Sequence, residues 1–468
     1  MLTTCRKITD FDCPYTLPTI KPKILLESQR VRRITILALP IIGAMVSQNI
    51  LNLVDTAMVS RLSESNAALA AVGFGGFILF FSQALLLGLS TGVQASASRQ
   101  KGQGRSDTTA HCLNTALVVI LIASPFLTLV LIWLAPKFFP ILSSDPNVAE
   151  LGIPYLQIRA ISIVFVAANF AFRGYWNAVD MTWLYLKSLV AMHAVNIFLN
   201  YVLIFGNLGA PKLGVDGAAI ASVIAVGFGT LTYCILGFRH ARQHGFLNRL
   251  PRPNEIYQLI KLSLPNGIQQ MFFAAGFIVM FWIIGKIGVA EVAAANVLIT
   301  MWLITLLPGM GMGLAAATLV GQALGKGNAE DAVEWGWDVS KVAFFGMFVI
   351  GLPFVVAPEI ILNSLYKLAP DTFDLAIWPM RLIGISILYE ATGVVLQGAL
   401  LGAGDTRRVM TVVVLGQWVV FLPIAYLIGP ILGYGLTAIW LTQLVYRMVQ
   451  TGIWINFWIG RKWTKIQL

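Results

Sequence analysis

The sequence has few charged residues for its length. Its 468 residues include 32 basic and 21 acidic side chains, so only 11 % are charged, whereas 57 % are hydrophobic. Soluble domains carry about a quarter charged residues because their surfaces face water. This composition excludes an ordinary soluble protein, and the 27 Phe and 13 Trp residues exclude a disordered one. The composition therefore predicts an integral membrane protein.

Residues of catalytic and metal-dependent chemistry are equally scarce. The four histidines are His111, His193, His240 and His244, and they have no zinc-binding spacing. The four cysteines are Cys5, Cys13, Cys112 and Cys234, and their spacing predicts no metal site and no disulfide. The sequence also lacks a Walker phosphate loop and a nucleophile elbow. We therefore expect neither an enzyme nor a bound cofactor.

Long apolar runs occur along the whole chain. They are continuous and longer than the roughly 10-residue alternating strands of a β-barrel, so they predict helices. We expect twelve transmembrane helices, at residues 34–58, 69–96, 113–135, 155–177, 184–206, 215–238, 258–284, 292–320, 339–363, 379–402, 409–430 and 432–458. The predicted fold class is an all-α integral membrane protein.

The basic residues predict the orientation in the membrane. With both termini and every second loop placed in the cytoplasm, 25 Lys and Arg residues fall on that side and 7 on the other. The four from Arg447 to Lys465 are counted as cytoplasmic. The net charge of +11 is thus an orientation signal, and no nucleic-acid partner is expected. No signal peptide is visible, and we expect a bacterial inner-membrane protein with a cytoplasmic tail at 1–29.

The two halves of the sequence resemble each other. At an offset of 225 residues, the segment around Pro40 matches that around Pro265, and Asp180 matches Asp405. Because each copy spans six helices, the copies have the same orientation and predict a pseudo-twofold axis along the membrane normal. The expected parts are the tail, an N-lobe at 30–240, a cytoplasmic linker at 241–257 and a C-lobe at 258–460. Duplication of this kind is a common plan for secondary transporters. The alternative interpretation is that it only builds a larger helix bundle.

Most of the 21 carboxylates fall in loops or near the ends of predicted helices, but two are placed within helices, where an ionised group costs about 2.5–3.5 kcal/mol at mid-bilayer. They are Asp55 in the first span and Glu390 in the tenth. Gln48 and Asn52 share a helix face with Asp55. Such a residue usually persists in a membrane helix because it has a function. The alternative interpretation of Asp55 is that it only makes a polar contact between helices. The alternative interpretation of Glu390 is a side chain that reaches toward the membrane surface.

Further polar residues extend this candidate site. The fifth span carries His193, Asn196 and Asn200 at helical spacing, and Ser222 in the sixth could complete a ring of oxygens. Such a ring suits Na⁺, and a desolvated carboxylate could instead carry H⁺. For His193 alone, a hydrogen-bonded imidazole inside the bundle is the simpler interpretation. Other candidates for lining a cavity are Asn266, Gln269, Gln417 and Gln443.

Three segments resemble the multidrug and toxic compound extrusion (MATE) transporters. They are QNILNLVDTAMV at 48–59, LGVDGAAIAS at 213–222 and GALLGAGDT at 398–406. The resemblance extends from about residue 31 to 458 and implies a secondary antiporter that exports organic, often cationic or amphipathic compounds against H⁺ or Na⁺. It further implies small-molecule substrates, no cofactor and no metal beyond Na⁺ at Asp55. We expect a monomer in the lipid bilayer.

The resemblance also assigns roles to individual residues. The DinF-like branch is the better match, since its N-lobe cation site implies coupling roles for Asp55, Asn196, Asn200 and Ser222, although that branch has an Asp where this chain has Asn200. The NorM-like branch uses a tenth-helix acid, which Glu390 matches, but its seventh-helix acid is missing here. The alternative is a flippase for lipid-linked oligosaccharides. Its anionic cargo requires basic residues inside the cavity, whereas this sequence places nearly all of them at helix ends or in cytoplasmic loops.

Overall fold

The computed structural model describes residues 27–62, 65–143, 145–366 and 368–466, which are nearly all helical and contain no strand. Cys5, Cys13 and most of the predicted tail lie outside these residues. The α-helices are α1 (Ser28–Val59), α2 (Ser65–Gly102), α3 (His111–Leu142), α4 (Pro146–Ala160), α5 (Ile163–Ala178), α6 (Thr182–Phe205), α7 (Gly214–Leu236), α8 (Pro253–Gly285), α9 (Val289–Gly325), α10 (Ala329–Val356), α11 (Pro358–Leu365), α12 (Pro370–Ala403), α13 (Thr406–Leu415), α14 (Leu422–Tyr426) and α15 (Gly435–Ile459). Two π-helical segments, η5 (Gly416–Phe421) and η6 (Leu427–Ile431), join α13, α14 and the end of that span.

Most predicted spans coincide with one long helical element, but 155–177 covers parts of α4 and α5, and 339–363 continues from α10 into α11. In the described chain, ten helical elements are long and apolar enough to cross a membrane. The bent pair of α4 and α5 is an eleventh, with a 50° angle at its break. The prediction of one straight helix at 155–177 was therefore wrong in detail. The twelfth element is α15, which is less apolar because it carries Arg447 and several amides.

Local sequence signals explain many helix ends. Proline occupies the first turn of α4, α8, α11 and α12, where its missing N–H costs no hydrogen bond. Asn328 caps α10 by accepting a hydrogen bond from the Asp331 backbone N–H at 3.0 Å. Gly404 ends α12 with a φ of 92°, a left-handed conformation that favours glycine.

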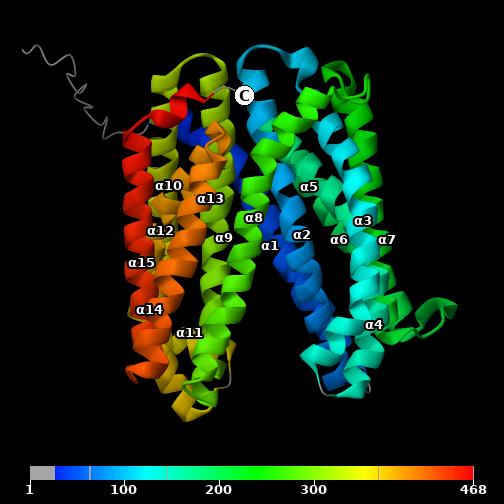
Figure 1. The fold of residues 1–468 in the computed structure, drawn as a ribbon, viewed down its shortest axis with the longest axis vertical. Coiled ribbons are helices and arrows are strands. Elements are labelled where there is room, and N and C mark those ends of the chain that lie inside the picture. Colours follow the sequence, from blue (N-terminus) through cyan, green and yellow to red (C-terminus); the bar gives the residue numbers. More distant parts are fainter. Residues whose placement is uncertain (1–26, 63–64, 144, 367, 467–468) are drawn as a thin grey trace, which may run out of the picture.

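The helices form two lobes (Figure 1), α1–α7 and α8–α15, each with its own apolar core. The lobes meet through two equivalent helix pairs, as a pseudo-twofold axis requires. Where α2 crosses α8, a Cβ atom on Gly88 would lie 2.7 Å from the backbone nitrogen of Gly267. Where α9 crosses α1, a Cβ atom on Gly311 would lie 3.3 Å from the nitrogen of Ile42. Only glycine allows the backbones to approach so closely.

Contacts between the lobes concentrate at one end of the molecule. We call this the linker end, because the segment at 242–252 between α7 and α8 lies there (Figure 1). In the described residues, every hydrogen bond between helices of the two lobes lies in this half. Gln322 of α9 donates to the Ala178 carbonyl and to Asp180, both at 2.9 Å. The lobes diverge toward the opposite end.

Ion pairs reinforce the linker end. Arg30 of α1 pairs with Asp338 of α10 at 2.6 Å and lies 3.9 Å from the ring centroid of Trp335. Lys101 of α2 pairs with Asp180 at 2.8 Å, next to the hydrogen bonds of Gln322. The α1 helix is thereby fixed to the C-lobe at its first turns.

Candidate functional site

A polar site occupies the N-lobe between α1, α6 and α7. Asn200 donates to the Asp55 carboxylate at 2.6 Å and to the Asn196 side-chain oxygen at 3.0 Å. Asn196 in turn donates to the Ser222 hydroxyl at 3.3 Å. The four residues that the sequence predicts as an N-lobe coupling site therefore form one continuous hydrogen-bonded chain.

A second branch of this polar site involves His193. Its Nδ1 atom lies 2.7 Å from the Ser47 hydroxyl, and its Nε2 atom lies 3.2 Å from the Gln48 side-chain oxygen. Gln48 also donates to Asn52 at 3.2 Å. The imidazole is thus fixed by two partners, which agrees with the simpler interpretation of His193 as a hydrogen-bonded residue of the bundle.

Burial changes along the N-lobe site. Asp55 is half-buried and lies one turn before the end of α1 at Val59, close to where its predicted span ends at residue 58. Asn200, in contrast, is fully buried, and its Oδ1 atom has no hydrogen-bond partner. Arg159 of α4 attracts the Asp55 carboxylate. The carboxylate therefore contacts a buried amide that has an unused acceptor.

These side chains fit a monovalent ion or proton better than a multivalent metal. No group of three or more His, Cys, Asp or Glu side chains in the described residues could hold a metal ion. Asp55 is the one carboxylate of the polar chain, and Asn196 and Asn200 supply amide oxygens. A bound Na⁺ would require the Asn200 amide to turn its oxygen toward Asp55, because its nitrogen faces the carboxylate in this structure.

The C-lobe acid lies in a different environment. Glu390 is only 2 % exposed, and its two carboxylate oxygens share the single N–H of the Trp302 indole, at 3.1 and 3.0 Å. The Arg447 Nε atom lies 3.5 Å from a Glu390 carboxylate oxygen. This buried ion pair neutralises the carboxylate with a cation that belongs to the chain itself.

Two expectations are corrected by this geometry. Glu390 does not reach toward the membrane surface, because its side chain is buried against Trp302 and Arg447 inside the C-lobe. Arg447 is not at the cytoplasmic end, since it stands at the midpoint of α15 with its side chain 14 % exposed. The C-lobe interior therefore contains a basic residue, an exception to the prediction that nearly all basic residues lie at helix ends or in cytoplasmic loops.

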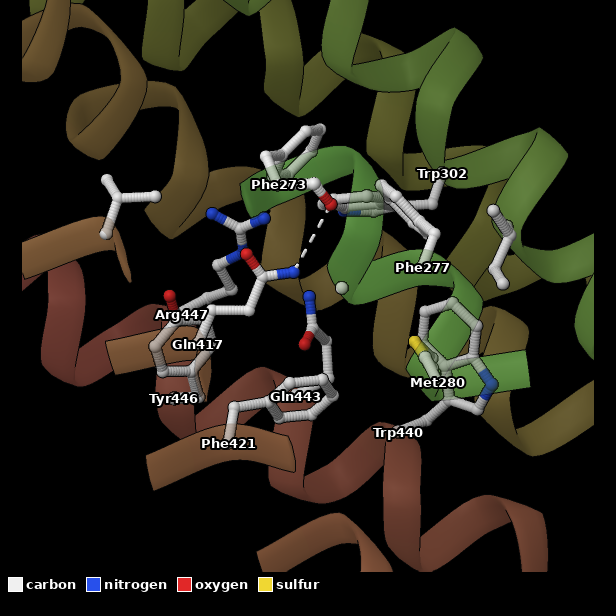
Figure 2. Close-up of a pocket in the computed structure, with 13 residues that line it drawn as sticks. Phe273, Phe277, Met280, Trp302, Gln417, Phe421, Trp440, Gln443, Tyr446 and Arg447 are labelled. Carbon is white, nitrogen blue, oxygen red and sulfur yellow. Dashed lines mark hydrogen bonds between the residues drawn. The ribbon is translucent and has the colours of Figure 1, made fainter. Parts of the chain in front are cut away.

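The remaining cavity candidates fall in two places. Asn266 donates to the Thr91 hydroxyl at 2.8 Å across the lobe contact, and Gln269 is buried one turn further along α8. Gln417 and Gln443 line a pocket inside the C-lobe, together with aromatic rings and Arg447 (Figure 2). The sequence thus identified polar residues in both lobes but did not separate packing positions from pocket positions.

The sequence reasoning missed Arg447, Trp302 and Ser47 as site residues. The signal for Arg447 was available, because a charge inside the predicted span 432–458 is as unusual as Glu390 inside 379–402. Trp302 and Ser47 had no comparable signal, since tryptophan and serine are common in membrane helices. Among the described cysteines, Cys112 and Cys234 are free, in agreement with the prediction.

The chain matches the MatE family model twice. The matched segments are residues 40–202 and 265–427, which together cover more than half of the chain. Both segments begin at a proline of the internal repeat.

Individual relatives are similar over most of their length. The chain is 24 % identical over 439 residues to a probable multidrug resistance protein NorM from Thermotoga maritima, covering 92 % of each chain. It is 26 % identical over 418 residues to a protein of the same description from Agrobacterium fabrum, covering 86 % of this chain and 88 % of the relative.

Solved structures share the fold. An outward-facing multidrug resistance MATE family transporter of the MOP superfamily matches with a TM-score of 0.85 and 20 % identity, over 94 % of this chain and 97 % of its own. A MOP superfamily transporter from Pyrococcus furiosus matches with a TM-score of 0.83 and 20 % identity, over the same shares.

Proposed function

Because the chain belongs to the MatE family of membrane transporters, we propose that it is a secondary active antiporter that exports organic compounds in exchange for H⁺ or Na⁺. The observation that carries the proposal is the hydrogen-bonded chain from Asp55 through Asn200 and Asn196 to Ser222. It joins one carboxylate to three neutral polar groups between α1, α6 and α7. The names of the NorM relatives support export of several unrelated compounds.

The coupling step that we propose is protonation of Asp55. With one carboxylate in the polar chain and an amide nitrogen facing it, a proton needs fewer rearrangements than Na⁺, which requires several oxygen ligands. The unused Oδ1 atom of Asn200 gives a protonated Asp55 an acceptor after the amide rotates. The membrane potential supplies about 2.3 kcal/mol per 100 mV for each positive charge that moves inward, and this free energy drives the entry of the coupling ion.

Export also requires the lobes to alternate between two arrangements. The contacts at the linker end hold the lobes together there, and the lobes diverge at the opposite end. If the linker end is cytoplasmic, as the basic residues predict, this arrangement exposes the interior outward, where cargo leaves and the coupling ion enters. Protonation of Asp55 would then favour closure of the outer end and opening of the linker end.

The flippase alternative is less well supported. An anionic pyrophosphate requires several unpaired cations, whereas the basic residue inside the C-lobe, Arg447, is already paired with Glu390.

We further propose an inner-membrane location, cytoplasmic termini and a monomeric state. The assignment to the DinF-like branch rests on Asp55 and Asn196 and stays a prediction.

Transport in everted membrane vesicles tests the proposal. A panel of fluorescent organic cations is offered under a pH gradient alone and under a Na⁺ gradient alone. We expect uptake with the pH gradient and its loss in Asp55→Asn, whereas Asp371→Asn, an exposed change in the first turn of α12, should transport normally. Wild-type rates in Asp55→Asn would show that this carboxylate does not couple transport, and uptake with Na⁺ alone would overturn proton coupling.

A further inference from the structure

A buried arginine near the end of α2 is held by backbone carbonyls of the opposite lobe. Arg99 is 9 % exposed, and one of its terminal nitrogens donates to the Ala403 carbonyl at 3.3 Å and to the Ile466 carbonyl at 3.2 Å. Among the described residues it pairs with no carboxylate, and its Nε atom makes no hydrogen bond. Burying a guanidinium without an acid is costly, so these two carbonyls are what hold it in place.

The Ala403 carbonyl lies at a helix end that needs a partner. Ala403 is the last residue of α12, where carbonyls have no acceptor role inside the helix and a cation is favoured by the helix dipole. The internal repeat provides a matching contact. At the offset of 225, Ala403 corresponds to Ala178, the last residue of α5, whose carbonyl accepts a hydrogen bond from Gln322 of α9 at 2.9 Å. Each lobe thus caps a helix end of the other.

The two caps differ in their second partner. Gln322 also donates to Asp180, in the loop that follows α5, at 2.9 Å. The equivalent acid of the C-lobe is Asp405, which pairs with Arg408 of its own lobe at 3.2 Å. The second partner of Arg99 is instead the Ile466 carbonyl, from the segment that follows α15. This segment therefore takes the place that a loop acid occupies in the other lobe.

We call residues 461–466 the strap. It contains the 3-10 turn η7 (Lys462–Lys465) and runs from the end of α15 across the linker end of the C-lobe (Figure 1). Trp463 is fully buried and stacks on Trp458 with ring centroids 4.1 Å apart, and its indole donates to the Trp458 carbonyl at 3.1 Å. Arg461 pairs with Glu330 of α10. The strap is thus fixed to the C-lobe, and its bond to Arg99 joins the two lobes.

Arg99 lies at a close crossing of α2 and α9. A Cβ atom on Gly325 would lie 2.8 Å from the Cα atom of Gly102, so the two backbones touch there. Opening of the linker end must separate these helices and carry Arg99 away from both carbonyls. Water then hydrates the guanidinium and offsets the lost bonds, whereas the closed arrangement buries it without an acid. The contact can therefore be made and broken reversibly.

We propose that Arg99 and the strap form a latch that holds the linker end closed. The latch is shut when the guanidinium reaches the end of α12 and the strap together, and it is released when the lobes change arrangement. The inference rests on the proposed function for the need to open this end. It assigns the strap a role in that movement, so displacement of the strap favours the open linker end.

Distances between spin labels on purified protein test the latch without cargo or an ion gradient. The labels are placed on Gln103→Cys and Arg407→Cys, exposed at the linker end of opposite lobes, after the four native cysteines are replaced by alanine. Arg99→Ala should raise the ratio of open to closed molecules by about tenfold, because two hydrogen bonds from a charged donor are lost. Trp463→Ala should raise it less, since Arg99 keeps its bond to Ala403.

The double variant Arg99→Ala, Trp463→Ala separates a latch from two independent effects. Both substitutions remove the same bond to the strap, so the ratio should be close to that of Arg99→Ala alone. Arg99→Lys is a second test that retains the buried charge but loses the guanidinium geometry, and it should raise the ratio as well. Melting curves of each variant show whether the protein is folded.

A matched arginine outside the lobe contact serves as the control. Arg242 donates to the carbonyls of Phe246 and Leu247 at 2.9 and 3.0 Å within one connecting segment, so Arg242→Ala should leave the distances unchanged. Wild-type distances in both Arg99→Ala and Arg99→Lys would overturn the latch, and additive effects in the double variant would remove the strap from it. The labels report opening whether or not Asp55→Asn transports normally, so failure of the latch and failure of the proposed function are recognised separately.

Discussion

The hydrogen bonds of Gln322 should set the balance between the two arrangements of the lobes. Its side chain is 4 % exposed and makes three bonds to the N-lobe, accepting one from Arg33 at 2.6 Å and donating to Ala178 and Asp180 at 2.9 Å. Gln322→Ala removes all three bonds at once. Because Gln322 belongs to α9 and its partners to the N-lobe, the loss falls on the contact between lobes.

The expected size of this effect follows from those bonds. A neutral hydrogen bond contributes about 0.5–1.5 kcal/mol net, and a bond to a charged group about 1.5–3 kcal/mol. Arg33 and Asp180 are roughly a third exposed, so water replaces much of what their bonds contribute. We expect a total of about 2–3 kcal/mol, which shifts the equilibrium toward opening at the linker end by roughly 30- to 150-fold.

Distances between spin labels measure this shift. Labels on Gln103→Cys and Arg407→Cys, both exposed at the linker end of opposite lobes, are introduced after the four native cysteines are replaced by alanine. Gln322→Ala should move the distance distribution toward longer values. The control is Gln157→Ala, which removes one bond to Ile132 within the N-lobe and should not change the distances. An unchanged distribution in Gln322→Ala would refute the reasoning.

Three further predictions concern packing, charge and the N-lobe site. Gly88→Val should lower the melting temperature of the purified protein by several degrees, because overpacking against Gly267 costs about 1–3 kcal/mol, and an unchanged melting temperature would contradict the close approach. Arg30→Gln should lower thermal stability at low salt and less so in 1 M NaCl, since it loses the pair with Asp338; equal losses at both salt concentrations would argue against an electrostatic role. Asn196→Ala should slow proton-driven uptake several-fold in vesicles while the protein stays folded, and a wild-type rate would remove it from the site.

Much of the fold could be predicted from the sequence because the membrane imposes simple rules. A helix must carry about 20 apolar residues to cross the bilayer, so the spans appear directly as apolar runs. The repeated prolines at 40 and 265 mark the same place in each copy and identify the duplication. The helix ends were less predictable, since α12 continues past its apolar run to Pro370 and α4 bends away from α5.

The N-lobe site could also be predicted, because its residues are polar in apolar surroundings. Asp55, Asn196 and Asn200 each cost free energy in a membrane helix, and helical spacing puts them on common faces. What the sequence could not give is the order of their contacts. Asn200 stands between Asp55 and Asn196, so the Asp present at its position in the DinF-like branch is replaced by a donor that binds both neighbours.

The C-lobe pocket was harder to predict for a physical reason that also explains its chemistry. Phe273 and Phe277 are apolar whether they face lipid or a pocket, so neither composition nor spacing distinguishes the two environments. A charged residue does distinguish them, because Arg447 at mid-helix must find a partner inside the protein. Its partner Glu390 was interpreted as a coupling acid when considered alone. Seen as a pair, the two charges cancel, so neither Glu390 nor Arg447 offers an unpaired charge to a ligand in this structure.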